Sequence, residues 1–377
     1  MSCNTTLYCP LIQDMMTYRR GASNSSEQLV STGIVWLHGL VSAFGVLENL
    51  LILWVIGFRV PRSVISVWIL NLAASDLLAT ASLPFFTLFL AKGGTWTLST
   101  TLCKAHSSVF FLNMFVSGFL LAAISLDRCL VSLFPVWVQN RRDVGLAMRV
   151  CGAIWVLAVL NTVPYYVFRD TIQRCDRRVM CYYNYRQLFP TGAGVNVLCR
   201  SRQNIMAFSK FLLAFLLPLV VIVGSHVAVG FSISRRGRRH TFRFFRLVVA
   251  VIISFFLCWA PYHVLSLLEA VADYYPSLRQ PVAQALPPLV SLAFINSILN
   301  PLLYVCSCPD FLATIRRSLG AVLEAVLIED LGELSRRRST ARSSASASEL
   351  LLKGHSPPPA LKSAPTSQQG DDHPIVF

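Results

Sequence analysis

Long apolar runs alternate with short polar segments along most of this chain. A helix rises about 1.5 Å per residue, so about 20 apolar residues cross the roughly 30 Å core of a bilayer. The runs are continuous and rich in Leu, Val, Ile and Phe, which favours helices over the short alternating strands of a membrane barrel. The pattern predicts an all-α membrane protein with a seven-transmembrane helix bundle over 33–305. The runs lie near 33–58, 66–90, 103–133, 146–168, 205–233, 244–272 and 281–305.

The composition narrows the class of protein. Of the 377 residues 54% are hydrophobic and 14% are charged, against about 25% charged in a typical soluble protein. This excludes a soluble enzyme and a nucleic-acid regulator, despite the net charge of +15. No catalytic triad, metal-ligand or phosphate-loop spacing stands out, so we do not expect an enzyme. No signal-peptide core precedes the first run, so the first span is expected to direct insertion.

The orientation follows from sequons, cysteines and arginines. Asn4 and Asn24 each begin a glycosylation sequon, which is modified only on the luminal side. Arginines gather in the loop 235–246 on the opposite side, although the loop 169–203 is basic too. We therefore predict an extracellular, glycosylated N-terminal segment at 1–32 and a cytoplasmic C-terminus. Six cysteines lie on the predicted outer side, where disulfides persist: Cys3, Cys9, Cys103, Cys175, Cys181 and Cys199.

Two further segments follow the seventh run. Residues 306–330 contain an amphipathic pattern that predicts a juxtamembrane helix lying on the membrane surface, with Cys306 and Cys308 as acylation candidates. Residues 331–377 are rich in Ser, Pro, Arg and Ala, which predicts a disordered cytoplasmic tail. The tail offers phosphorylation sites at Ser335, Ser339, Thr340, Ser343, Ser344, Ser346 and Ser348.

A carboxylate lies inside the second run, at Asp76. A charge in hydrocarbon is costly and is presumed to be functional. One carboxylate among amides and hydroxyls can hold a small cation, so we predict an allosteric sodium site and no other cofactor. Hydrogen bonding between helices is the alternative role. The other polar groups at similar depth are Asn49, Asn113, Ser117, Asn296, Ser297 and Asn300.

The main candidate for ligand binding is Lys210, within the fifth run. A buried ammonium requires an anion, whereas snorkelling to the membrane surface is the alternative. The basic loop 169–203 would lie above Lys210 as a collar that attracts anionic ligands. An amphiphile with one carboxylate and an apolar body fits this arrangement. The cleft is predicted to be lined by Phe85, Phe86, Phe89, His106, Phe110, Phe111, Tyr262, Leu286 and Pro287.

A series of motifs occurs in order, about one per expected helix, over residues 30–325. They are Asn49, Asn71-Leu72-Ala73 with Asp76, Asp127-Arg128, Trp155, Cys258-Trp259-Ala260-Pro261 and Asn300-Pro301-Leu302-Leu303-Tyr304. With the Cys103/Cys181 pair, this series resembles the rhodopsin-type (class A) G protein-coupled receptors.

The resemblance implies residue roles. Cys103 and Cys181 would form a disulfide, and Arg128 would engage the G protein after release from Asp127. Trp259 would be the pivot of the sixth helix. The inner switch of the seventh helix would comprise Asn300, Pro301 and Tyr304. Cys129 and Thr241 depart from the family pattern, so we expect no strong ion pair from Arg128 to the sixth helix.

A narrower resemblance rests on longer segments, among them 82–86, 111–115, 123–130, 180–184 and 209–215. They are similar to the prostaglandin-binding branch of the leukocyte chemoattractant receptors. This implies a receptor for prostaglandin D2 or a related carboxylate lipid mediator, which acts through inhibitory G proteins to lower cAMP and drive chemotaxis. Receptor kinases and arrestin would act on the tail.

The same resemblance suggests the ligand contacts. Lys210 and Arg169 would hold the carboxylate, and His106, Tyr182, Tyr183 and Tyr262 would shape the cleft. A Cys9–Cys199 bridge is implied, which leaves Cys3 and Cys175 to pair with each other or to stay unassigned. A receptor for an anionic peptide is the alternative, and an anion transporter is a remote one.

Overall fold

The computed structural model describes residues 8–17, 25–188, 194–235, 241–307 and 317, with the side chains of all but 25–31, 233–235, 241–249, 251–252 and 304–307. The chain divides into two compact units, Met1–Arg316 and Arg317–Phe377, and all described helices and strands belong to the first. The predicted helix at 306–330 lies almost wholly outside the described residues. Asn4, Asn24, Cys3 and the predicted phosphorylation sites of the tail also lie outside them.

Seven helical segments of the described residues are long and apolar enough to cross a membrane, which confirms the predicted seven-helix bundle. Six of them are single helices: Ser25–Phe58 (α2), Val64–Ala91 (α3), Thr100–Leu133 (α4), Val144–Phe168 (α6), Thr241–Val271 (α9) and Arg279–Ser307 (α10). The fifth span, 195–235, consists of α7 (Val195–Lys210), the π-helical segment η1 (Phe211–Leu216) and α8 (Leu217–Arg235). Shorter helices are Pro10–Thr17 (α1), Pro135–Arg141 (α5) and the 3₁₀ turn Pro276–Leu278 (η2).

Short polar side chains mark where several spans begin. Ser63 accepts a hydrogen bond from the Ser66 backbone at the start of α3, and Asp143 accepts one from Leu146 at the start of α6. Each satisfies an amide that has no partner within its own helix. Prolines lie inside several spans, which neighbouring helices of a bundle can tolerate.

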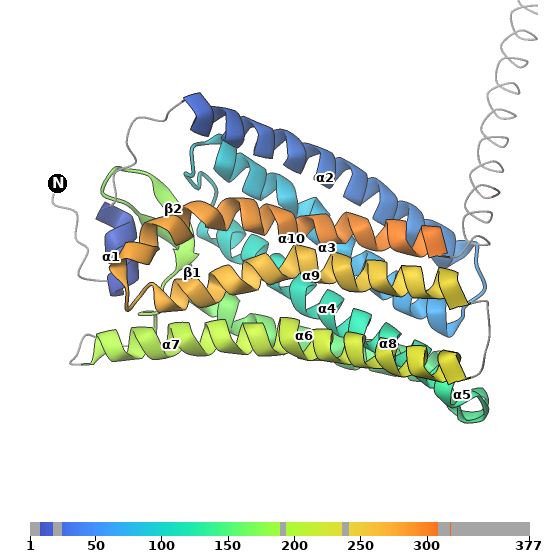
Figure 1. Ribbon diagram of the computed structural model, residues 1–377. Coiled ribbons are helices and arrows are strands. Elements are labelled where there is room, and N and C mark those ends of the chain that lie inside the picture. Colours follow the sequence, from blue (N-terminus) through green and yellow to red (C-terminus); the bar gives the residue numbers. More distant parts are fainter. Residues whose placement is uncertain (1–7, 18–24, 189–193, 236–240, 308–316, 318–377) are drawn as a thin grey trace, which may run out of the picture. The chain divides into compact units, whose positions relative to one another are not determined.

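The helix α4 runs through the middle of the bundle and contacts α3, α6 and α8 (Figure 1). The helix α2 packs on α3 and α10, and α9 packs on α10. Trp155 Nε1 of α6 donates to Asn71 Oδ1 of α3 at 2.9 Å, which joins these two spans with a polar contact. Large side chains fill the interior, including Phe115, Trp259 and Phe294.

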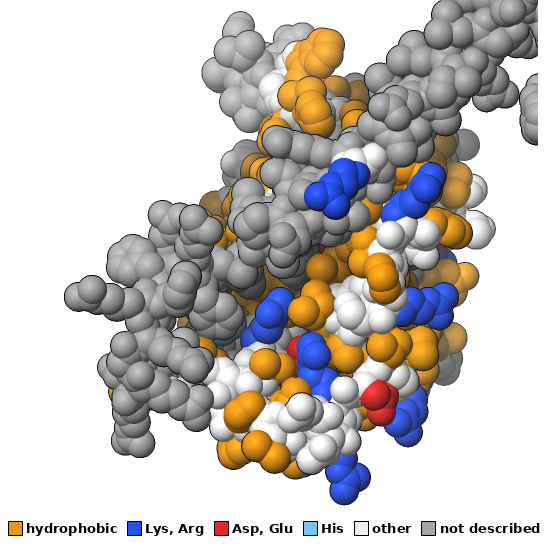
Figure 2. Space-filling view, turned by 90° about the vertical axis from the view of Figure 1, so that its right-hand side faces the viewer, with side chains coloured by type: hydrophobic (Ala, Val, Ile, Leu, Met, Phe, Trp, Pro, Cys, Tyr) orange, Lys and Arg blue, Asp and Glu red, His pale blue; other side chains and the backbone are white. Residues whose placement is uncertain are grey.

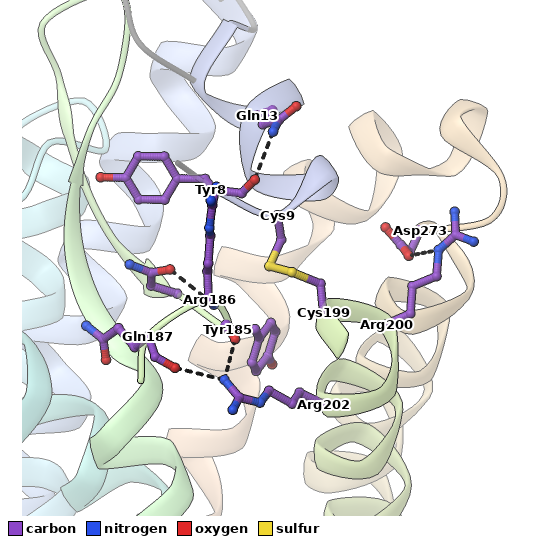
Figure 3. Close-up of a disulfide and its surroundings, with 11 residues drawn as sticks. Tyr8, Cys9, Gln13, Tyr185, Arg186, Gln187, Cys199, Arg200, Arg202 and Asp273 are labelled. Atoms are coloured by element: carbon purple, nitrogen blue, oxygen red, sulfur yellow. Dashed lines mark hydrogen bonds and ion pairs between the residues drawn. A yellow bond between two sulfur atoms is a disulfide. The ribbon is translucent and has the colours of Figure 1, made fainter. Parts of the chain in front are cut away.

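A β-hairpin and α1 lie at one end of the bundle, which we call the outer end (Figure 1). Its antiparallel strands are Arg169–Gln173 (β1) and Val179–Tyr183 (β2). The predicted Cys103–Cys181 disulfide is confirmed, and it joins β2 to α4. The predicted Cys9–Cys199 disulfide is also confirmed, and it joins α1 to α7 (Figure 3). Cys175 is disulfide-bonded too.

The interpretation of 169–203 as one loop is wrong. The hairpin occupies 169–183, and the fifth span begins at Val195 rather than near 205. Lys210 is therefore the last residue of a sixteen-residue helix, and not about the sixth residue of the fifth span. Residues 195–203 are too polar to be counted as part of an apolar run, although they continue the same helix.

The opposite end of the bundle, where α5 lies, faces the viewer in Figure 2. Lys and Arg side chains are spread over its described part among hydrophobic ones, and acidic side chains are sparse there. Arg59, Arg62, Arg141 and Arg149 are exposed. This distribution agrees with the prediction that this is the cytoplasmic end.

Candidate functional site

Lys210 lies inside the bundle, with 4% of its surface exposed. Its Nζ donates to Tyr262 Oη of α9 at 3.4 Å and lies 5.6 Å from the ring centre of Phe111 and 5.9 Å from that of Tyr165. The side chain therefore does not snorkel to the membrane surface. The π-helical segment η1 begins directly after Lys210, and such segments insert an extra residue that changes the direction of neighbouring side chains.

Arg169 is the second cation of the site, and the hairpin register positions it. Arg169 lies directly opposite Tyr183 in the β1–β2 pair, so both side chains project from the same face. The Arg169 guanidinium lies 4.8 Å from the Tyr183 ring centre, and its Nε is buried without a hydrogen-bond partner among the described residues. Neither Arg169 nor Lys210 forms an ion pair with another described residue.

A continuous row of rings connects the two sides of the site. Phe110 lies 5.4 Å from Tyr262 and 5.3 Å from Phe294, and Phe294 lies 6.5 Å from the ring of His106. Phe86 stacks on His106 at 6.0 Å. Nδ1 of His106 is buried without a partner among the described residues. We call these residues and their neighbours the Lys210 cluster. It comprises Lys210, Arg169, Phe86, Phe89, Trp96, His106, Phe110, Phe111, Tyr165, Tyr182, Tyr183, Tyr262 and Phe294.

Most residues predicted to bind ligand meet in this cluster. Leu286 packs against the same core and Pro287 is half-buried, whereas Phe85 is 38% exposed and does not belong to it. Tyr165, Trp96 and Phe294 belong to the cluster but were not among the predicted site residues. The spacing of Phe294 from Pro287, two helical turns along α10, was a signal that could have identified it.

Several arginines of the predicted basic collar make contacts within the protein. Arg178 pairs with Asp176 at 2.6 Å, and Arg200 pairs with Asp273 at 2.7 Å. Arg202 donates to the backbone oxygens of Tyr185 and Gln187 (Figure 3). The contacts of Arg200 and Arg202 join α7 to the end of α9 and to the segment after the hairpin. Arg169 is the arginine of 169–203 that belongs to the Lys210 cluster.

Burial sets the protonation of Tyr183 at the end of the hairpin and of Tyr185 just after it. It raises the pKa of Tyr183, although the nearby Arg169 guanidinium counteracts part of the rise. Burial also raises the pKa of Tyr185. Both phenols therefore remain neutral at physiological pH, and Tyr183 can donate a hydrogen bond to an anion held by Arg169.

Asp76 forms a second polar cluster deeper in the bundle. Its Oδ1 accepts from Asn113 Nδ2 at 2.9 Å and from Ser117 Oγ at 3.4 Å, and its Oδ2 accepts from Asn300 Nδ2 at 2.9 Å. Asn296 is buried as well, with both amide atoms unpartnered among the described residues. The structure thus brings together the residues predicted for a sodium site.

The inner end has an ion pair that the sequence did not predict. Arg142 donates to both oxygens of Asp127, from Nε at 2.7 Å and from Nη2 at 2.9 Å. These bonds raise the pKa of Arg142 above its usual value. Arg128 is half-buried beside the pair, Trp259 is buried against Phe110 at 6.1 Å, and the side chain of Tyr304 lies outside the described residues.

The seven spans, the Asp127-Arg128 motif at the inner end and the polar residues around Asp76 together indicate one class of protein. Residues 48–304 match the family described as "7 transmembrane receptor (rhodopsin family)", and the chain belongs to that family. It is a G protein-coupled receptor, a multi-pass protein of the plasma membrane, and it is not an enzyme.

Among known members, the chain resembles prostaglandin D2 receptor 2. It is 56% identical to that receptor of Mus musculus over 354 residues, which cover 93% of this chain and 92% of the relative. It is 58% identical to that of Rattus norvegicus over 322 residues, which cover 85% and 79%. Chemerin-like receptor 1 of Homo sapiens is 35% identical over 308 residues, which cover 80% and 82%. The similarity to chemoattractant receptors supports chemoattractant signalling.

Proposed function

We propose that this receptor binds prostaglandin D2 or a closely related carboxylate lipid mediator and signals through an inhibitory heterotrimeric G protein. The observation that carries the proposal is Lys210, a buried ammonium whose polar contact among the described residues is the neutral phenol of Tyr262. A buried cation without a counter-ion is costly, so an entering carboxylate would be strongly favoured there. The printed name of the relatives that are 56% and 58% identical supports this choice of anion.

The cover over the outer end favours a lipid over a peptide. Ile12 and Met16 of α1 are 1% and 3% exposed, and they belong to the same core as Tyr182 and Tyr183. The Cys9–Cys199 disulfide and the hydrogen bond from Cys175 N–H to Met16 O hold α1 in this place. A peptide chain would have to displace α1, whereas a single fatty acid derivative is much smaller. A receptor for an anionic peptide is the second candidate.

The contacts of Tyr262 suggest how ligand binding at the outer end changes the structure of the inner end. A carboxylate at Lys210 Nζ would compete with Tyr262 Oη, which the ammonium now contacts at 3.4 Å. Tyr262 lies one helical turn from Trp259 in α9, and both rings contact Phe110. A ligand can shift the packing of α9 only through its different affinity for the two packings, and about 1–3 kcal/mol of coupling is typical. Movement of α9 away from Arg128 would then open the surface that binds the G protein.

A sodium ion is proposed as an allosteric ligand of the Asp76 cluster. The unpartnered amide of Asn296, one helical turn before Asn300, fits a bound cation, and so does the buried Ser297 hydroxyl near Asp76. Asp76, Ser117 and the amide oxygens of Asn113 and Asn300 would hold it, and the ion would supply a positive charge to balance the buried carboxylate. The carboxylate, already held by three donors, would keep these helices together in the packing that the ion favours.

The test of the anchor is a binding measurement with radiolabelled prostaglandin D2 and its methyl ester. Lys210→Ala should weaken binding of the acid by about 2–5 kcal/mol, because the carboxylate is left desolvated and unpaired. The ester should bind weakly to the parent receptor and lose little more in the variant. Lys104→Ala is a matched control, since Lys104 lies over the ring of Tyr166, away from the cluster. Normal binding of the acid to Lys210→Ala would refute the anchor.

The signalling part of the proposal has its own test. Prostaglandin D2 should inhibit cAMP formation in transfected cells, and pertussis toxin should remove that inhibition. A rise in cAMP, or a toxin-insensitive response, would contradict coupling to inhibitory G proteins. A peptide with a free C-terminus that competes with the radioligand and signals more strongly than any prostanoid would favour the second candidate.

A further inference from the structure

His263 lies inside the bundle on α9, directly after Tyr262, and 0% of its surface is exposed. Both ring nitrogens, Nδ1 and Nε2, are buried without a hydrogen-bond partner among the described residues. Buried polar groups in proteins are almost always hydrogen-bonded, and one that lacks a partner is destabilising. The carboxylate anchor at Lys210 does not use His263, so the proposed function does not explain this imidazole.

The neighbours of His263 are mainly aromatic rings. Phe215 stacks on the imidazole with ring centres 5.1 Å apart, and Phe211 lies edge-on at 6.4 Å. Both phenylalanines belong to η1, the π-helical segment that follows Lys210. Rings of this kind pack against an imidazole but do not satisfy its nitrogens. A phenylalanine at 263 would therefore fit the surroundings at least as well, and packing alone does not account for the histidine.

Trp259, like His263, has a buried ring nitrogen to which no described residue is hydrogen-bonded. It lies one helical turn before His263 on the same face of α9, and the two ring centres are 6.3 Å apart. Trp259 is 1% exposed, and its Nε1 is also buried without a partner among the described residues. An indole N–H can only donate, whereas a neutral imidazole has one donor and one acceptor. A single oxygen atom could therefore be bonded to both side chains.

Tyr262 connects this pair to the carboxylate anchor. Its ring centre lies 5.6 Å from that of His263 and 6.4 Å from that of Trp259, and its hydroxyl contacts Lys210 Nζ. The helix α9 runs from the inner end to the outer end, so Trp259 lies deeper in the bundle than Tyr262. A ligand whose carboxylate is held at Lys210 could therefore extend its body past Tyr262 towards the pair.

We propose that His263 and Trp259 form a second polar subsite, which binds an oxygen atom on the body of the ligand. The subsite would select oxygenated fatty acids over plain ones. This inference rests on the proposed function, because it takes the carboxylate to be held at Lys210. Trp259 Nε1 donates to the ligand oxygen, and the imidazole donates to a carbonyl or accepts from a hydroxyl. A plain hydrocarbon chain would leave both side chains desolvated and unpaired, and this is how a site rejects an analogue that lacks one polar group.

Matched ligands on matched variants test the subsite. The probes are prostaglandin D2, an analogue with a methylene in place of its ring carbonyl, an analogue without its ring hydroxyl, and arachidonic acid. His263→Phe should weaken binding of prostaglandin D2 by roughly tenfold, since one buried hydrogen bond is lost. It should not weaken binding of arachidonic acid, nor of the analogue that lacks the bonded oxygen.

Two further variants separate the hydrogen bond from the shape of the ring. His263→Gln retains a donor and an acceptor, so it should recover most of the affinity for prostaglandin D2. His226→Phe is the matched control, because His226 is a half-buried histidine of α8 outside the Lys210 cluster. It should bind all four acids as the parent receptor does.

The melting temperature of the ligand-free receptor gives a second measurement. His263→Phe should raise it, because an unpartnered polar group is replaced by an apolar one of similar shape. An ordered water that satisfied both nitrogens would give the opposite result, since its removal would destabilise the receptor. A lower melting temperature in His263→Phe would therefore assign the imidazole to a structural water and overturn the subsite.

The binding measurements can overturn the subsite in two other ways. Unchanged affinity of His263→Phe for prostaglandin D2 would show that the imidazole does not bind the ligand. An equal loss for all four acids would show that it acts on the cleft and not on a ligand oxygen. If the parent receptor bound no prostaglandin D2, the proposed function would fail and the subsite with it. If the parent bound it and His263→Phe lost nothing, only the subsite would fail.

Discussion

Asp76 is 0% exposed and accepts hydrogen bonds from Asn113, Ser117 and Asn300. These donors come from two other helices, so the charge of one side chain influences how three spans pack. A cation beside the carboxylate would favour the packing in which all these groups converge. We therefore expect the charge of Asp76, rather than its size, to matter for the proposed response to sodium.

Replacement of Asp76 by Asn tests the role of that charge. Sodium should lower agonist affinity in the parent receptor by several fold, and Asp76→Asn should remove this effect because an amide does not attract the cation. The measurement is agonist binding in sodium and in N-methylglucamine buffers. Ser75→Ala is the control, since Ser75 Oγ contacts Asn113 but not the carboxylate. An undiminished sodium effect in Asp76→Asn would exclude the proposed ion site.

Among larger elements, α5 is held to the bundle by Arg142. Both oxygens of Asp127 are bonded to this guanidinium, so Asp127 is not available to hold the neighbouring Arg128. We expect Arg142→Ala to free Asp127 for Arg128 and to lower agonist-stimulated GTPγS binding by about threefold to tenfold, with ligand affinity changed less than about twofold. This size corresponds to a loss of about 0.6–1.4 kcal/mol, the scale expected for a partly buried ion pair with two hydrogen bonds.

Arg141→Ala is the matched control for this prediction, because Arg141 is the preceding residue and is exposed. It should couple as the parent receptor does. Equal coupling in Arg142→Ala would show that the Asp127–Arg142 pair does not assist G protein coupling. Stronger coupling would show that the pair restrains it.

The Cys9–Cys199 disulfide holds α1 in place at the outer end of the bundle. Without it, α1 keeps its apolar contacts but loses the covalent link to α7 (Figure 3). The double variant Cys9→Ser with Cys199→Ser should release prostaglandin D2 at least roughly fivefold faster and lose about 2–4 kcal/mol of stability. A chase with unlabelled ligand measures the release, and Cys151→Ala, which removes a buried free thiol, is the control. Unchanged release would mean that α1 does not cover the bound ligand.

Sequence patterns predicted the spans well because the membrane imposes length and hydropathy on each helix. They missed the outer half of α7 because its arginines lower the hydropathy, although buried Cys199, Gln203, Met206 and Lys210 recur at helical spacing. The two disulfides were predicted from resemblance. The Asp127–Arg142 pair and the row of rings at His106 depend on how separate helices pack, which no local pattern encodes.

At the scale of the bundle, α2, α3 and α10 meet at Gly45. A Cβ added there would contact Cγ2 of Thr80, lie 2.9 Å from Thr80 Cβ and lie 3.0 Å from Ile298 Cγ2. Thr80 cannot turn away without loss, because its Oγ1 donates to Asp76 O at 2.8 Å. The close approach of three spans therefore requires a residue without a side chain.

Alanine substitution separates this packing effect from helix propensity. Alanine is favoured over glycine in a helix by about 1 kcal/mol, so Gly39→Ala, at an open position, should be neutral or raise thermal stability. Gly45→Ala gains the same propensity but forces α2 away from α3 and α10, at a cost of about 1–3 kcal/mol. We expect Gly45→Ala to lower the melting temperature of the detergent-solubilised receptor by a few degrees, and the sodium response of Asp76 to weaken with it. If Gly45→Ala were as stable as Gly39→Ala, the close contact of Gly45 with Thr80 and Ile298 would not determine how closely the three spans pack.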